Sequence, residues 1–134
     1  MKVIAVNGSP RKDWNTAAML RQALQGSADR GALTELIHLY ELDYRGCSSC
    51  FACKTRGDPS YGRCALQDDL APVLQRIEKA GALILGSPIY FGQVTGGMRS
   101  FLERLLFPYL RYSRSERSLF PGEMDTDWIY TLNC

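Results

Sequence analysis

Four cysteines lie close together in one stretch of this chain. Cys47, Cys50, Cys53 and Cys64 fall within the nineteen residues GCSSCFACKTRGDPSYGRC. Such a group can form disulfides, bind a metal ion or an iron–sulfur cluster, or consist of thiols that only pack. Clustered cysteines of a reducing compartment are more often ligands or redox groups than structural bridges. Disulfides are therefore the least favoured of these interpretations.

A second group of chemically useful residues follows the first apolar run. The segment NGSPRKDWNT has neither the three glycines of a dinucleotide fingerprint nor the Gly-Lys-Ser/Thr ending of a Walker loop. It does offer hydroxyls, an amide, a guanidinium and backbone N–H groups at a helix start, which suit one terminal phosphate. The alternative is a polar turn in which Asn15 or Thr16 caps the helix.

A third segment, GSPIYFGQVTGG, places apolar and aromatic side chains beside several glycines. A planar heteroaromatic ring could lie against such a wall, with its polar edge on main-chain N–H groups. The alternative is a pair of aromatic side chains packed in the core. A phosphate site and a ring site at the same edge of a sheet would be improbable by chance, so the combination favours a ligand.

The elements that must position these segments alternate along the chain. Short β-branched or apolar runs predict strands at 2–6, 33–39, 82–88 and 127–133, and helical spacing predicts helices at 15–30, 68–78 and 98–107. Strands alternating with helices require right-handed crossovers and a parallel sheet, which is an α/β doubly wound architecture. Ligands of such sheets bind at the carboxyl ends of the strands, where the loops 8–16, 40–67 and 87–97 lie.

Composition restricts the remaining possibilities. A chain of 134 residues with a net charge of +2 is long enough for one domain and too weakly basic for a nucleic-acid surface. The run of arginines near the carboxyl end is expected to be a solvated face: Arg99, Arg104, Arg111, Arg114 and Arg117. No segment is long and apolar enough for a leader or a membrane span, so we expect a cytoplasmic protein without a membrane or nucleic-acid partner.

These three segments together resemble the flavodoxin-like, NADPH-dependent FMN reductase family, and within it the iron–sulfur flavoprotein branch. The resemblance covers positions 1 to 110 in order, and GSPIYFGQVTGGMRSFLER is its most specific part. It implies FMN as cofactor, NAD(P)H as electron donor and a second electron acceptor. The FMN phosphate would be held by Ser9, Arg11, Asn15 and Thr16, and the ring would lie beside Pro88, Ile89, Tyr90, Phe91 and Gly92.

The same resemblance implies a [4Fe–4S] cluster on Cys47, Cys50, Cys53 and Cys64, close to the flavin. The first three keep the C-x2-C-x2-C spacing of ferredoxin runs, and the ten residues before the fourth contain Gly57, Pro59 and Gly62, so the loop can return at little entropic cost. Free thiols and a zinc site remain the alternatives. Cys134 has no evident partner, His38 is expected to be structural and Trp14 to cover the first helix.

We therefore expect one flavodoxin-like FMN-binding domain over 1–134, with a cysteine-rich insertion at about 46–64. It would pass electrons from NAD(P)H or a reduced carrier to a small acceptor such as a quinone or a flavin, or to a ferredoxin-type carrier. The alternative is a non-catalytic, truncated module stabilised by zinc or by partner subunits. The expected strand order is 2-1-3-4 with a fifth strand missing, which leaves an apolar edge and predicts a homodimer or homotetramer.

Overall fold

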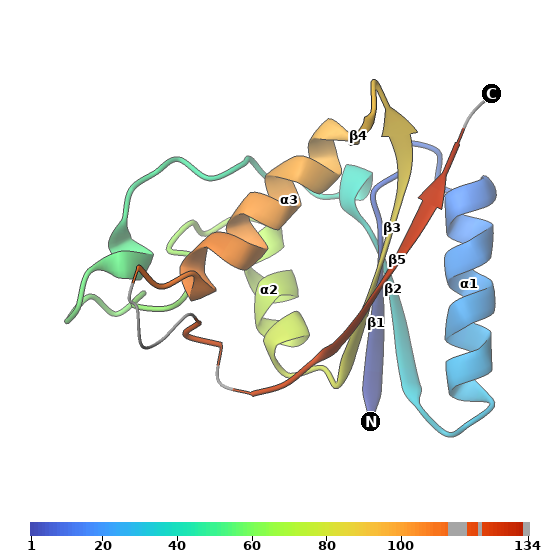
Figure 1. Ribbon diagram of the computed structural model, residues 1–134, viewed down its shortest axis with the longest axis horizontal. Coiled ribbons are helices and arrows are strands. Elements are labelled where there is room, and N and C mark those ends of the chain that lie inside the picture. The colour runs from blue at the N-terminus through green and yellow to red at the C-terminus, as the bar shows by residue number, and fades with distance from the viewer. Residues whose placement is uncertain (113–117, 121, 133–134) are drawn as a thin grey trace.

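The fold is a central sheet with helices on both faces (Figure 1). The computed structural model describes residues 1–112, 118–120 and 122–132. Helix α1 (Asn15–Ala28) covers one face of the sheet, and α2 (Leu70–Glu78) and α3 (Gly96–Leu106) lie on the other. This arrangement is the α/β doubly wound, flavodoxin-like architecture that the sequence predicts.

Four strands of the sheet are parallel and follow the order β2-β1-β3-β5. A short fifth segment, β4, pairs antiparallel with β3 as a hairpin that the sequence analysis does not predict. The predicted order of the four parallel strands is confirmed. The strands are β1 (Lys2–Asn7), β2 (Leu33–His38), β3 (Ala82–Tyr90), β4 (Gln93–Val94) and β5 (Asp125–Thr131).

Strand β1 is buried on both faces because helices cover each side of the sheet. Ile4 and Val6 belong to the core cluster shared with α2 and α3. Val3 and Ala5 point the other way and pack with Leu20 of α1. This alternation follows from the two-residue period of a strand and explains why β1 reads as an unbroken apolar run.

Several boundaries differ from the predictions. Strand β3 continues to Tyr90, and β5 lies at 125–131 instead of 127–133. Three single turns of 3-10 helix also appear, at Leu39–Glu41, Ala52–Lys54 and Phe107–Tyr109. Helix α3 ends just before Pro108, as expected for a residue without an N–H donor.

One prediction about the arginines is wrong. Arg99 is exposed, but Arg104 is only 1% exposed and lies among the largest fully buried side chains. Its charge is compensated by Asp68, which approaches it from a distant part of the chain. Arg114, Arg117 and Cys134 lie outside the described residues.

None of the helices in the described part of the chain combines the length and the apolar character that crossing a bilayer requires.

Candidate cofactor sites at the two ends of α3

The loop after β1 is hydrogen-bonded to strand β3 and to the segment that follows the β3–β4 hairpin. The N–H of Gly8 donates to the carbonyl of Gly86 at 2.8 Å, and the hydroxyl of Thr95 donates to the carbonyl of Gly8 at 2.6 Å. A Cβ atom on Gly8 would lie 2.9 Å from the Cβ of Met98, so only glycine permits this approach. The phosphate-type loop and the ring-type loop therefore share one edge of the sheet, as predicted.

The loop after β1 folds around its own polar groups. The N–H of Ser9 donates to Oδ1 of Asn7 at 2.9 Å, and the N–H of Arg11 donates to Oγ of Ser9 at 3.1 Å. Helix α1 then starts without a side-chain cap, with Trp14 at the N-cap position. The interpretation of Asn15 or Thr16 as the cap is therefore wrong. An uncapped helix start leaves its first N–H groups available to an anion.

Two of the predicted phosphate residues have other contacts. Thr16 is buried and shares a hydrogen bond of 2.7 Å between its hydroxyl and that of Thr131, which ties α1 to β5. Arg11 is exposed, and its guanidinium lies 4.1 Å from the centre of the Trp14 ring. Trp14 is itself 58% exposed, so most of its ring does not cover the helix as expected, and the ring instead contacts the Arg11 guanidinium. Arg11 and Asn15 are exposed at the loop surface, whereas Ser9 is buried beneath it.

The predicted ring wall forms the end of β3 and its turn into β4. Pro88, Ile89 and Tyr90 belong to the strand, and Phe91 and Gly92 form the turn with φ angles of 51° and 74°. The Phe91 side chain is fully exposed, at 107% of its reference area. The alternative interpretation, an aromatic pair packed in the core, is therefore wrong.

Sequence reasoning did not identify the residues that support these loops from β2 and the segment after it. Nδ2 of Asn7 lies 3.0 Å from Nδ1 of His38, which confirms the structural role expected for the histidine. The hydroxyl of Tyr44 donates to the carbonyl of Gly97 at 2.7 Å, and burial raises the pKa of Tyr44 to about 12. The ring of Tyr40 would lie 3.0 Å from a Cβ on Gly97. The contact between Asn7 and His38 could have been found from the sequence by aligning the two parallel strands, because these residues are paired in β1 and β2.

The four cysteines of the insertion line one cavity. All four are free thiols in the described part of the chain, so no disulfide joins any two of them. Burial is the main cause that raises the pKa of Cys53, and the other three thiols raise it further. Within the described ranges, no three or more His, Cys, Asp or Glu side chains are arranged so that they could hold a metal ion.

The cysteine cavity lies at the carboxyl end of α3. The N–H of Cys47 donates to Oε2 of Glu103 at 3.3 Å, and Nζ of Lys54 donates to the carbonyls of Phe107, Pro108 and Leu110. The phosphate-type and ring-type loops lie at the amino end of α3, beside Thr95. Thr95 and Glu103, which contact the two candidate sites, are eight residues apart and therefore about 12 Å apart along the axis of α3. The segment that carries the cysteines lies toward the carboxyl end of α3, and the turn between β3 and β4 lies at its amino end (Figure 1).

A doubly wound sheet with two ligand-type loops at one edge defines a flavodoxin-like protein. Residues 1–120 match the NADPH-dependent FMN reductase family, and the chain belongs to that family.

Several known proteins are similar to this chain. An iron–sulfur flavoprotein of Methanocaldococcus jannaschii is 38% identical over 104 residues, which cover 78% of this chain and 51% of the relative. One from Archaeoglobus fulgidus is 36% identical over 78% of this chain and 48% of its own length. The chain thus spans about half the length of these curated relatives.

Solved structures share the fold. An NADH:FMN oxidoreductase in its apo form is 28% identical, with a TM-score of 0.57 over 81% of this chain and 52% of that one. An NAD(P)H:quinone oxidoreductase from Methanothermobacter marburgensis has a TM-score of 0.74 at 18% identity, over 98% of this chain and 65% of that one. At that identity the second likeness concerns the fold alone.

Proposed function

We propose that this chain binds FMN and works as an oxidoreductase that passes electrons from NAD(P)H to a small acceptor such as a quinone or a flavin. The observation that carries the proposal is the hydrogen bonding of Gly8, after β1, to Gly86 in β3 and to Thr95 after β4. These bonds bring the loop suited to an anion and the apolar wall to one edge of the sheet, which supports FMN binding there. Bound FMN would supply the hydride chemistry, and the protein would hold and tune it.

The phosphate of FMN would lie at the start of α1. The uncapped N–H groups of the first turn, the Arg11 guanidinium and the polar groups of Ser9 and Asn15 are the donors available there. Since the Thr16 hydroxyl is engaged with Thr131, the contribution of Thr16 is assigned to its backbone N–H.

The ring would lie against the end of β3. Pro88, Ile89 and Tyr90 supply an apolar surface, and the backbone around Gly92 can approach the polar edge of a ring because no side chain intervenes. The exposed Phe91 side chain would cover one face of the ring.

A [4Fe–4S] cluster on the four cysteines is the second part of the proposal. Four free thiols around one cavity are the donor set that such a cluster requires, and similar curated proteins are named iron–sulfur flavoproteins. A zinc ion needs four sulfurs at about 2.3 Å from one point. A cubane is bound differently, because each thiolate ligates a separate iron. Four cysteines suit either centre, and the names of the similar curated proteins favour the cluster over zinc and over a non-catalytic zinc-stabilised module.

FMN binding is tested by titrating FMN with the purified chain and following the quenching of flavin fluorescence. The Arg11→Gln variant should bind FMN at least about tenfold more weakly, because a charge-assisted hydrogen bond contributes roughly 1.5–3 kcal/mol. Arg30→Gln, at the opposite end of α1, is the matched control and should bind as the wild type does. A folded wild-type chain that leaves the fluorescence unchanged at every concentration would overturn the proposal.

The cluster is tested by anaerobic reconstitution with iron and sulfide. We expect about four iron and four sulfide per chain. Cys53→Ser should lower both numbers, whereas Cys134→Ser should not. Stoichiometric zinc in place of iron, in a colourless preparation, would instead support the non-catalytic module.

A further inference from the structure

The buried guanidinium of Arg104 contacts the cysteine segment at both of its ends. We propose that Arg104 positions Cys64 as the fourth ligand of the cluster and raises the reduction potential of that cluster through its hydrogen bond to the Cys64 sulfur. The inference rests on the proposed [4Fe–4S] site and deepens it. Arg104 is a positioning residue in this account, because it would act on the cluster through Cys64.

All five N–H groups of the Arg104 guanidinium have acceptors. Nε donates to Sγ of Cys64 at 3.1 Å. Nη1 donates to the carbonyl of Arg45 at 3.1 Å and to Oδ2 of Asp68 at 2.5 Å. Nη2 donates to the carbonyl of Leu66 at 3.2 Å and to Oδ1 of Asp68 at 3.0 Å. A fully buried guanidinium with every donor used is held in one orientation.

The oxygen acceptors lie on either side of the four cysteines in the sequence. Arg45 precedes Cys47, and Leu66 and Asp68 follow Cys64. The guanidinium therefore joins the two ends of the insertion and attaches both to α3. This contact accounts for the long spacer before Cys64: the fourth thiol reaches the cavity because Arg104 holds the returning chain.

The hydrogen bond to sulfur has an electronic consequence as well. A cluster gains negative charge on reduction, and an N–H donor to a ligand sulfur stabilises the more negative state. Asp68 carries the opposite charge next to the same guanidinium and opposes this effect. Arg104 and Asp68 should therefore shift the potential in opposite directions.

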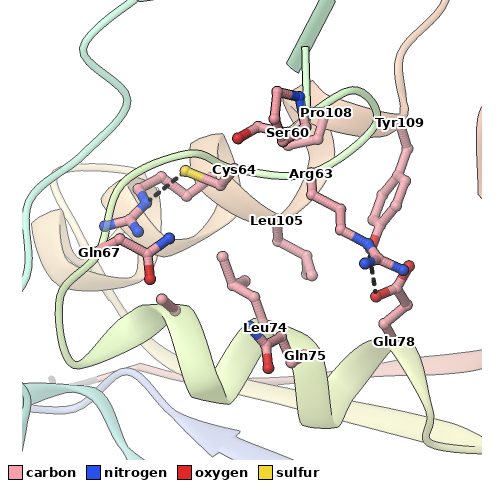
Figure 2. Close-up of a pocket in the computed structure, with 13 residues that line it drawn as sticks. Ser60, Arg63, Cys64, Gln67, Leu74, Gln75, Glu78, Leu105, Pro108 and Tyr109 are labelled. Carbon is pink, nitrogen blue, oxygen red and sulfur yellow. Dashed lines mark hydrogen bonds and ion pairs between the residues drawn. The ribbon is translucent and has the colours of Figure 1, made fainter. Parts of the chain in front are cut away.

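Cys64 also separates two cavities. It lines the cavity shared by the four thiols and a second, more polar cavity between the segment 59–67, α2 and the end of α3. Figure 2 shows the Cys64 sulfur on the wall of the second cavity, at the end of a dashed hydrogen bond, with the ion pair of Arg63 and Glu78 farther along. Arg104 lines both cavities too, so the Cys64–Arg104 contact forms part of the wall between a cluster and this pocket.

The test compares three variants after anaerobic reconstitution: Arg104→Gln, Asp68→Asn and the control Arg76→Gln. Arg76 also pairs with a carboxylate, Glu35 at 3.0 Å, but lies on the exposed face of α2. The readouts are iron content and the reduction potential measured by a spectroscopic redox titration. We expect a lower potential for Arg104→Gln, a higher one for Asp68→Asn and an unchanged one for Arg76→Gln. A tenfold change in the reduced-to-oxidised ratio corresponds to about 59 mV for one electron.

The outcomes separate this inference from the function on which it rests. Shifts of the same sign in Arg104→Gln and Asp68→Asn would mean that both only loosen the loop, and would overturn the inference. Normal iron content with unchanged potentials would overturn it too. If the wild type takes up no iron and sulfide, the proposed cluster itself is wrong. If Arg104→Gln does not fold, a raised potential in Asp68→Asn supports the inference and an unchanged one refutes it.

Discussion

Asn7 organises the loop after β1 through its side-chain amide. Its Oδ1 accepts the N–H of Ser9 at 2.9 Å, so its Nδ2 must be the atom that faces His38, at 3.0 Å. Nδ1 of the histidine therefore accepts a hydrogen bond and is unprotonated. Burial lowers the pKa of His38, and the nearby Glu41 offsets this only in part. The side-chain amide of Asn7 thus connects the proposed phosphate loop to the protonation state of His38 in β2.

This contact predicts how stability depends on pH. Because the folded-state pKa of His38 lies below its usual value of 6.5, the unfolded chain binds more protons as the pH falls through 6.5. The stabilisation is therefore present above pH 6.5 and is lost as the pH falls toward the folded-state pKa. Urea unfolding at pH 7.5 and 5.5 should show a larger loss of unfolding free energy in the wild type than in His38→Gln.

The change of stability near pH 6.5 is assigned to His38 because it is the only histidine of the chain. Glu35, Glu41 and Asp68 have lowered pKa values, so their contributions are lost only below about pH 4.5. Equal pH dependence in wild type and variant would contradict the assignment.

The β3–β4 hairpin combines an unfavourable backbone with an exposed aromatic ring. Positive φ angles at both central residues, Phe91 and Gly92, are those of a type I′ turn, in which Asn-Gly is preferred. A phenylalanine in the left-handed region costs roughly 1–2 kcal/mol. This combination supports the proposed contact of Phe91 with the flavin ring.

Replacing Phe91 should therefore separate stability from binding. Phe91→Asn is expected to raise the free energy of unfolding by about 1 kcal/mol, because asparagine tolerates this conformation. The same change should weaken FMN binding several-fold through loss of the ring. Phe91→Tyr keeps both the ring and the strain and should match the wild type in urea unfolding and FMN titration. Weaker binding in Phe91→Tyr, or unchanged binding in Phe91→Asn, would argue against contact with the flavin.

Strand β5 lies at one edge of the sheet in the part of the chain that the structure describes. Within the described ranges it pairs with β3 alone, and an apolar groove lies between it and α3, lined in part by Leu102, Leu106 and Trp128. Tyr130 is 52% exposed and stacks on Trp128, with ring centres 5.4 Å apart. Such an edge is a template for association with another chain. The homodimer or homotetramer predicted from the sequence thus remains a prediction with a defined surface.

Sedimentation velocity over a range of concentrations measures this association. We expect concentration-dependent sedimentation of the wild type and at least about tenfold weaker association of Tyr130→Lys, because a buried unpaired charge costs more than 1.4 kcal/mol. Met19→Lys, on the outer side of α1, is the control and should associate normally. Monomeric behaviour of the wild type at every concentration would contradict the prediction.

The amino-acid sequence by itself determined the elements and the edge at which the loops meet. Apolar periodicity is local, so β1, α1, β3 and α3 could be predicted from neighbouring residues. Since parallel strands end at the same edge, the proximity of the loops after β1 and β3 followed from their order alone.

Only the tertiary structure decided which distant groups meet. Arg104 belongs to a run of arginines for which the sequence predicts a solvated face. Its burial depends instead on Asp68 and on the carbonyls of Arg45 and Leu66, which are far away in the sequence. The family resemblance predicts that the cysteines lie close to the ring loop, but they lie toward the other end of α3. In both cases the deciding term is the satisfaction of buried polar groups by distant partners, which local periodicity does not encode.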